Sequence, residues 1–271
     1  MKLNIAVVQF AIKSLDPKYN LEKMESFISE AKARGAQVVA FPEDVVTGSI
    51  EGLPQYSDTE GHYVRHFQSL AEKYSIDILP GSFIEVEDGK EYNVSYYIDS
   101  QGKILGRHKK KYLWKTEGEY YARGTGATIF DTSYGKVGIL ICWDMAFPDL
   151  WQEMLESEVQ VIFCPSYWSY EDAGAGQEYN KDSEVAFVNS LISSRAFLNE
   201  SVVVFINPGR EVTPVSWSSI GRSQITAPFL GPIKRLDHNN EEMFIEEVDL
   251  DILKIAENIY KIRNENTINR D

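Results

Sequence analysis

The central segment of the chain reads Gly138-Ile-Leu-Ile-Cys142-Trp-Asp-Met-Ala-Phe-Pro148-Asp149, an apolar strand pattern that runs into a cysteine and then into a turn and a helix. The pattern places a thiol at a strand end, beside the free N–H groups of a starting helix. This environment favours the thiolate and stabilises an adjacent oxyanion, which predicts a nucleophile. The alternative is a buried strand cysteine that acts as a small hydrophobic residue, and Cys142 taken alone favours that alternative.

Two other segments supply charged side chains at predicted strand ends. The apolar run Gln37-Val-Val-Ala-Phe41 breaks at a proline, which puts Glu43 just past the end of a second strand. Three consecutive lysines, residues 109–111, follow a later strand pattern, and one of them could reach the same sheet edge. Glu117 follows them along the chain.

A carboxylate, an ammonium and a thiol at neighbouring strand ends form a complete set for acyl transfer. The carboxylate can take the thiol proton as a general base and return it to a leaving amine, provided that burial raises its pKa. The ammonium favours the thiolate and the tetrahedral oxyanion, and the backbone N–H after the cysteine would complete an oxyanion hole.

With these residues in place, the chain resembles the carbon–nitrogen hydrolase family, also called the nitrilase superfamily, over nearly its whole length. Phe41-Pro-Glu43 resembles the glutamate motif of that family, Gly106-Arg-His-Lys-Lys110-Lys-Tyr-Leu-Trp114 its lysine motif, and Ile141-Cys142-Trp-Asp-Met-Ala-Phe-Pro148 its cysteine motif. The resemblance implies a four-layer α-β-β-α sandwich. It also implies a homodimer or larger homo-oligomer, and the tail of residues 258–271 could contact a partner subunit.

The resemblance also implies roles for individual residues. It makes Glu43 the general base, Lys110 the oxyanion stabiliser and Cys142 the nucleophile. Glu117 matches a further glutamate that positions the lysine and the substrate. The choice of Lys110 among the three lysines rests on the spacing of the family motif, and the outer two are interpreted as a charge run in solvent.

Three aromatic residues are further candidates for the site. The backbone N–H of Trp143 is predicted to hold the oxyanion together with the lysine. A polar, aromatic, glycine-containing loop from Tyr167 to residue 182 is predicted to form a pocket wall or a dimer contact. Tyr167 and Trp168 are therefore candidate substrate-binding residues, with ordinary loop aromatics as the alternative.

Composition limits the possible partners and compartments. The 271 residues carry a net charge of −14, which disfavours nucleic acid and anionic membranes as partners. The chain has 2 cysteines, which favours free thiols in a reducing compartment. We find no signal-peptide pattern, no membrane-length apolar run and no linker. We therefore predict one domain, residues 1–271, in the cytosol.

The periodicity of the sequence by itself supports only an α/β fold. Helices are predicted over residues 21–34, 62–74, 148–156, 183–199 and 251–260, and strands over residues 3–10, 38–41, 76–84, 92–98, 103–106, 159–163 and 202–206. A hairpin pair is predicted around residues 223–227 and 244–248. His62 and His66 have the spacing of two metal ligands on a helix, but no partner ligand accompanies them, so they are interpreted as surface histidines. No metal or cofactor is predicted.

The predicted function is hydrolysis of a non-peptide C–N bond in a small amide through a cysteine thioester. The sequence Cys142-Trp-Asp resembles the cysteine motif of amide-hydrolysing members of this family more than that of nitrile-hydrolysing members. Met145 and Ala146 stand where carbamoylases that bind amino-acid carboxylates often have arginine, which disfavours that subclass. Hydrolysis of nitriles or N-carbamoyl compounds remains an alternative, and so does a non-catalytic protein that binds small amides.

Overall fold

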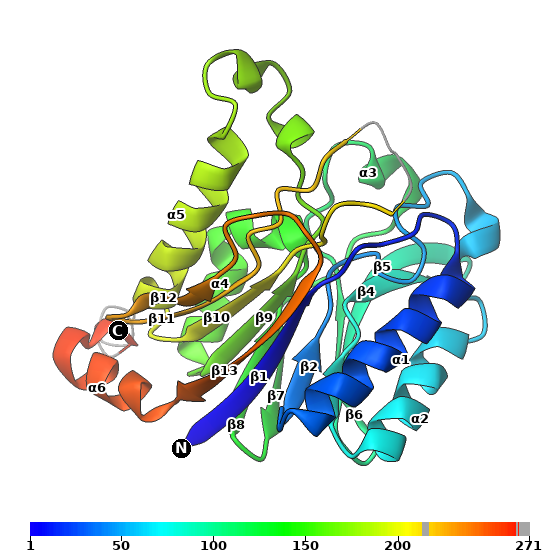
Figure 1. Cartoon of the computed structure of the whole chain (residues 1–271). Coiled ribbons are helices and arrows are strands. Elements are labelled where there is room, and N and C mark those ends of the chain that lie inside the picture. The colour runs from blue at the N-terminus through cyan, green and yellow to red at the C-terminus, as the bar shows by residue number, and fades with distance from the viewer. Residues whose placement is uncertain (213–216, 264, 266–271) are drawn as a thin grey trace.

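The computed structural model describes residues 1–212, 217–263 and 265, which form two β-sheets packed face to face (Figure 1). In these residues the first sheet has the order β13-β1-β2-β3-β5-β4, with β6 paired to β5. Its strands are β1 (Lys2–Gln9), β2 (Val38–Ala40), β3 (Asp77–Leu79), β4 (Ser82–Glu87), β5 (Lys90–Ile98), β6 (Ile104–Lys109) and β13 (Glu242–Asp249). The second sheet has the order β12-β11-β10-β9-β8-β7. Its strands are β7 (Thr128–Thr132), β8 (Gly135–Ile139), β9 (Val161–Pro165), β10 (Val202–Ile206), β11 (Gln224–Ala227) and β12 (Gly231–Arg235).

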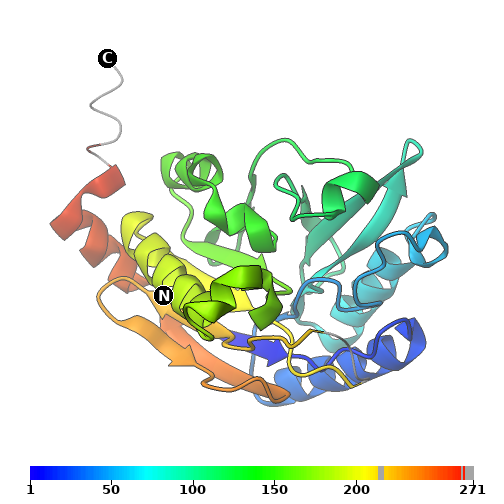
Figure 2. The same cartoon turned by 90° about the horizontal axis from the view of Figure 1, so that it is seen from above.

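Helices cover the outer face of each sheet. The first sheet carries α1 (Pro17–Ala33) and α2 (His62–Tyr74), and the second carries α4 (Pro148–Glu156) and α5 (Ser183–Leu198). Figure 2 shows the blue and cyan helices on one side of the sheets and the green and yellow-green helices on the other. The remaining helices are α3 (Glu117–Tyr120), α6 (Asp251–Tyr260) and the 3-10 helices η1 (Pro54–Tyr56), η2 (Cys142–Ala146) and η3 (Tyr170–Glu178).

Alternating side chains of the central strands fill separate apolar layers. In β1, Ile5 and Val7 pack between the two sheets, whereas Ala6 and Val8 pack beneath α1 and α2. Strand β10 divides its side chains in the same way between the inter-sheet core and the layer under α4 and α5. Because successive side chains of a strand point to opposite faces, a strand that is apolar at every position must be covered on both sides. The prediction of a four-layer α-β-β-α sandwich is confirmed.

Most predicted elements occur, and two predictions about strands are wrong. The helices predicted over residues 62–74, 148–156 and 251–260 have those bounds in the structure. The predicted hairpin between residues 223–227 and 244–248 does not form, because β11 pairs with β10 and β12 while β13 crosses to β1 in the other sheet. The single strand predicted over residues 76–84 is two strands, β3 and β4, broken at a glycine with a φ of +76°.

The expectations about membrane-spanning helices and about the C-terminal tail can also be compared with the structure. In the described part of the chain, no helix combines the length and the apolar character needed to cross a bilayer. The predicted tail of residues 258–271 lies partly outside the described residues, since 264 and 266–271 are not among them.

Candidate active site

Glu43 lies directly beyond β2, at the edge where the two sheets meet. Its backbone N–H donates to the carbonyl of Ser166, which follows β9 in the other sheet. Gly81 supports this segment, because a Cβ at position 81 would lie 1.8 Å from the carbonyl oxygen of Pro42. The side chain of Glu43 is 2% exposed, and its Oε1 accepts from Asn93 Nδ2 at 2.9 Å. Asn93, on β5, was not singled out from the sequence.

Lys110 follows β6 and reaches the same point from the other side. Its Nζ donates to Glu43 Oε1 at 2.8 Å and to Glu117 Oε1 at 2.7 Å. The other carboxylate oxygen of Glu117 accepts the backbone N–H of Trp114 at 2.5 Å. One buried ammonium therefore lies between two buried carboxylates, at the start of the short helix α3.

Cys142 begins η2, just beyond β8, and has a φ of +47°. This left-handed conformation is uncommon for a residue with a side chain and occurs often at functional sites. The thiol is buried, and the backbone N–H of Tyr167 donates toward it. Cys142 and Glu43 each affect the pKa of the other, so the sulfur and the carboxylate are neighbours.

Burial and neighbouring charges set the protonation of these groups. Burial raises the pKa of Cys142 well above its ordinary value and the Glu43 carboxylate raises it further, while Lys110 acts in the opposite direction. The expectation that this environment favours the resting thiolate is therefore wrong, because burial and Glu43 outweigh the ammonium. Burial also raises the pKa of Glu43, and the Glu117 carboxylate adds to that effect.

Lys110 remains charged despite its burial. Burial alone would lower the pKa of Lys110, but the carboxylates of Glu117 and Glu43 reverse the direction and raise it well above its ordinary value. An ammonium that is held charged and dry can stabilise a developing oxyanion, because it needs no reorganisation during the reaction.

Replacing Lys110 by methionine is expected to lower the free energy of unfolding by about 3–5 kcal/mol at neutral pH, because two buried carboxylates lose their shared partner. The deficit should shrink as the pH falls and Glu43, whose pKa is raised, becomes protonated. Urea unfolding at several pH values measures both effects. The matched control is Lys109→Met, which removes a partly exposed ion pair with Glu87 and should cost about 1 kcal/mol or less. Equal losses for the two variants would contradict this interpretation.

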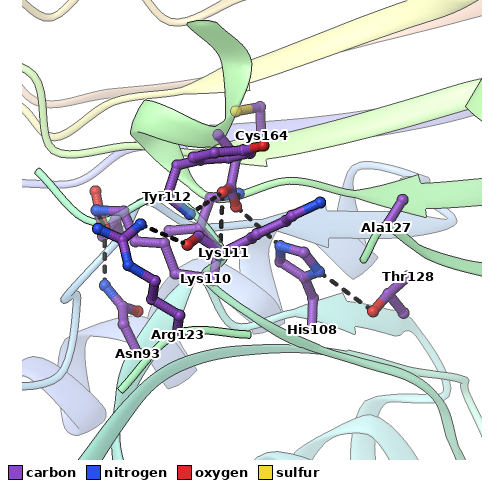
Figure 3. A network of polar contacts seen from close by, with 12 residues as sticks. Asn93, His108, Lys110, Lys111, Tyr112, Arg123, Ala127, Thr128 and Cys164 are labelled. Carbon is purple, nitrogen blue, oxygen red and sulfur yellow. Dashed lines mark hydrogen bonds and ion pairs between the residues drawn. The ribbon is translucent and has the colours of Figure 1, made fainter. Parts of the chain in front are cut away.

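Asp144 connects the cysteine segment to the lysine segment. Its Oδ2 accepts the backbone N–H of Ile141 at 3.0 Å and lies 2.9 Å from His108 Nε2. Its Oδ1 accepts the backbone N–H groups of Lys111 and Tyr112 at 3.1 and 2.8 Å. In Figure 3 the ring of His108 lies between Thr128 and the segment from Lys110 to Tyr112.

Neither Asp144 nor His108 was predicted to have a structural role. Each is 0% exposed, and Asp144 bonds to backbone groups of both segments that flank the reactive side chains. The sequence signal was the acidic residue two positions after the cysteine, but its partners are distant in the chain. His108 is bonded to Asp144 and Thr128, so its ring is not a partner of the cysteine.

The reactive groups share a pocket of about 270 Å³. The described residues that line it are Glu43, Asp44, Ser49, Glu51, Lys110, Trp114, Lys115, Glu117, Cys142, Tyr167, Ser169, Glu171, Asp172 and Trp217. The loop after β9 therefore forms one wall of the pocket, as predicted. The volume suits a small molecule, since it lies just below the range of about 300–1,000 Å³ that is typical of sites for drug-sized ligands.

Trp168 and the outer lysines of the run do not line the pocket. Trp168 is 3% exposed and packs in the core against the Trp143 ring, at a centroid distance of 5.7 Å, so it supports the wall from behind. The outer lysines of the run, Lys109 and Lys111, form partly exposed ion pairs with Glu87 and Asp149. Among residues 1–212, 217–263 and 265, no group of three or more His, Cys, Asp or Glu side chains is arranged to hold a metal ion.

Comparison with known proteins places this chain in a family. Residues 4–255 match the family model described as "Carbon-nitrogen hydrolase". The Schizosaccharomyces pombe protein named "Probable nitrilase C965.09" is 32% identical over 270 residues, which cover 96% of this chain and 94% of the relative. An omega-amidase of Xenopus tropicalis is 27% identical over 93% of this chain and 90% of its own length.

The solved structures agree with the sequence relatives. The crystal structure of Saccharomyces cerevisiae Nit3, a member of branch 10 of the nitrilase superfamily, superposes with a TM-score of 0.83. It is 25% identical, and the match covers 95% of this chain and 93% of that one. The chain therefore belongs to the carbon–nitrogen hydrolase family, a family of enzymes in the nitrilase superfamily.

Proposed function

We propose that the protein hydrolyses a small amide through a thioester formed on Cys142, with release of ammonia or an amine. The observation that carries this proposal is the convergence of Glu43, Lys110, Glu117 and Cys142 on one pocket. Each group has the chemistry of one step, and none of the steps requires a metal or an organic cofactor.

Acylation begins with the transfer of the thiol proton. The Glu43 carboxylate takes this proton as the sulfur of Cys142 attacks the amide carbonyl carbon, and a C–S bond forms. The Lys110 ammonium and the backbone N–H of Trp143 hold the resulting oxyanion. Protonated Glu43 then gives the proton to the leaving nitrogen, the C–N bond breaks, and a thioester remains.

Deacylation repeats these steps with water. The Glu43 carboxylate takes a proton from water as the water oxygen attacks the thioester carbon. The C–S bond then breaks, and Glu43 returns the proton to the sulfur. Glu117 holds Lys110 in place during both halves and helps to position the water.

The raised pKa values fit this proton transfer. Since burial and Glu43 keep Cys142 as a thiol, the sulfur must lose its proton as it attacks. Since burial raises the pKa of Glu43, this carboxyl group holds a proton more readily than an ordinary carboxyl group and can return it to the leaving nitrogen. A carboxyl group with an ordinary pKa near 4.3 would be a poor acid at neutral pH.

The rate with a neutral amide is expected to rise with pH along an acid limb that lies above the ordinary carboxylic range, because Glu43 must be ionised to act as a base. Glu117→Gln should move this limb to lower pH, since the Glu117 carboxylate is one of the groups that raise the pKa of Glu43. The pH profile of kcat/KM measures both effects. A limb at or below the ordinary range, or an upward shift in Glu117→Gln, would contradict the assignment of the base.

An amide is favoured over a nitrile as substrate, although the relatives include both an omega-amidase and a protein named as a nitrilase. Ammonia release from a panel of amides, carbamoyl compounds and nitriles tests the choice. Release from amides supports the proposal, and release from nitriles alone contradicts it. Binding of amides without any turnover would support the non-catalytic alternative.

We also propose a homo-oligomer in a reducing compartment such as the cytosol. Both cysteines are free thiols in the structure, and Phe187, Phe197, Leu198, Ile255 and Ile259 expose apolar surface on α5 and α6. Exposed apolar side chains on adjacent outer helices are typical of a subunit interface. Sedimentation velocity at several protein concentrations tests the assembly.

A further inference from the structure

We propose that this pocket selects amides whose far end carries a positive charge, through an acidic wall formed by Asp44, Glu51, Glu171 and Asp172. The inference rests on the proposed amide hydrolysis and names its substrate class: a small amide or carbamoyl compound with an ammonium or guanidinium group.

The first argument is the balance of charge in the pocket. Lys110 is ion-paired with Glu43 and with Glu117, so its positive charge is balanced by the reacting groups and does not offset the acidic wall. Among the described residues that line the pocket, the other titratable groups with a full charge when ionised are the four carboxyl groups of the acidic wall and one ammonium, on Lys115. Burial and the neighbouring carboxylates of Glu43 and Glu117 raise the pKa of Asp44 well above its ordinary value. A bound cation favours the ionised form of such a group, so the wall as a whole attracts a cationic ligand more than a carboxylate.

Lys115 offsets only part of the charge of the wall, through its effect on the carboxyl group of Asp172. Its Nζ donates to the backbone carbonyl of Asp172 at 3.3 Å and lies 4.7 Å from the centroid of the Trp114 ring. Within the described part of the chain, it forms no ion pair with a carboxylate of the wall. The lysine side chain is therefore held by a neutral oxygen and an aromatic face.

The wall carboxylates are oriented by neutral donors. Glu51 accepts from the Thr116 hydroxyl at 2.6 Å, Glu171 accepts the Ser218 N–H at 2.7 Å, and Asp172 accepts the Ser169 N–H at 2.7 Å. Such bonds fix the direction of a carboxylate without adding a positive charge beside it. Burial raises the pKa of Asp172, and the Lys115 ammonium acts in the opposite direction. Trp114 and Trp217 also line the pocket, and their faces can hold a cation.

Asp44 is the second, independent observation. It is 6% exposed, and its Oδ1 is buried with no hydrogen-bond partner among the residues that the structure describes. Its backbone is fixed, because Asp44 N–H donates to Ser82 Oγ and its carbonyl accepts from Gly48 N–H at 2.7 Å. A buried acceptor without a partner is costly, and the N–H group of a bound cation would satisfy it.

Tyr121 offers a rival explanation for Asp44. The Tyr121 hydroxyl is also buried and unpartnered in the described residues, and after burial itself the Asp44 charge is the main cause of its raised pKa. A small shift could let the hydroxyl donate to Asp44. In that case Tyr121→Phe would change the charge preference as much as Asp44→Asn does. We expect only Asp44→Asn to change it.

Three amides of matched length test the proposal: δ-aminovaleramide, valeramide and glutaramate, which end in an ammonium, a methyl and a carboxylate group. We expect kcat/KM to fall in that order, by about 100-fold or more between the first and the last, since each factor of ten needs only about 1.4 kcal/mol. The ratio should shrink as the ionic strength rises. Binding of the same amides to Cys142→Ala, measured by calorimetry, gives a readout independent of turnover.

Variants identify the residues responsible. Glu51→Gln and Asp172→Asn should each reduce the ratio of δ-aminovaleramide to glutaramate about 10-fold, by loss of one partly screened charge. The matched control is Glu22→Gln on the exposed face of α1, which should leave the ratio unchanged. Lys115→Gln should increase the ratio. If it instead abolishes a preference for glutaramate, Lys115 is a carboxylate anchor and the proposal is overturned.

Failure of this inference and failure of the proposed function have different signatures. Equal hydrolysis of the three amides, or a preference for glutaramate, overturns the charge selection and leaves amide hydrolysis standing. If none of these amides nor any other amide in the panel is hydrolysed or forms an adduct on Cys142, the proposed function itself is wrong.

Discussion

Replacing Cys142 by alanine is expected to abolish amide hydrolysis, with a loss in kcat of about 10⁶-fold, while the protein stays folded. The sulfur is the protein atom that forms a covalent bond to the substrate carbon in the proposed mechanism. The ion pair joins Lys110 directly to Glu43 and does not include the neighbouring thiol. Loss of the thiol should therefore leave this ion pair intact. Ammonia release under substrate saturation measures the effect, and circular dichroism with thermal unfolding checks the fold.

The second cysteine provides the matched control. Cys164 lies in β9, is 0% exposed and packs in the core beneath α4 and α5. Cys164→Ala should keep kcat within about tenfold of the wild type and should mainly reduce stability, by loss of buried volume. Full turnover in Cys142→Ala would contradict the assignment of the nucleophile. So would a Cys164→Ala variant that folds and yet has no activity.

Replacing Glu43 by glutamine is expected to block acylation, with a loss of about 10⁴-fold in the rate of the first ammonia release. Glutamine keeps the size of the side chain and an oxygen that can accept from Lys110 and Asn93, so the geometry of the site should persist. What it cannot do is take the proton from the thiol, which burial holds on the sulfur. Rapid-quench measurement of ammonia and of acyl-enzyme follows the first turnover.

Glu117→Gln is the comparison that separates the two glutamates. Both carboxylates lie within 2.8 Å of Lys110 Nζ, at 2.8 Å for Glu43 and 2.7 Å for Glu117, so the distance to the lysine does not identify the base. We expect Glu117→Gln to form the acyl-enzyme slowly and Glu43→Gln to form none. The reverse result would exchange the roles of the two residues.

The α/β class could be predicted from local signals and the four layers from the family resemblance, whereas the strand pairing could not be predicted. Residues 202–206 are apolar at every position, which is how a strand covered on both faces appears in a sequence. The strand β13, however, pairs with β1 across almost the whole chain, with Lys2 opposite Asp249. Its sequence does not identify the neighbouring strand, so only the packing of the complete fold selects the partner.

The reactive residues could be predicted from three short motifs, but their environment could not. The resemblance named Glu43, Lys110 and Cys142, and the structure brings all three to one pocket. The raised pKa of Cys142 depends on how much of the fold excludes water from the thiol, which no motif records. Asp144 was missed for a similar reason, because its importance comes from partners around position 110 that are distant in the chain.

The most direct test of the account is mass spectrometry of the enzyme quenched with acid during turnover of an amide. The account predicts a mass increase equal to the acyl group on the peptide that contains Cys142, formed as ammonia is released and lost as the substrate is consumed. Turnover at the same rate with the acyl group on another residue, or with no covalent adduct under conditions that trap thioesters, would contradict it.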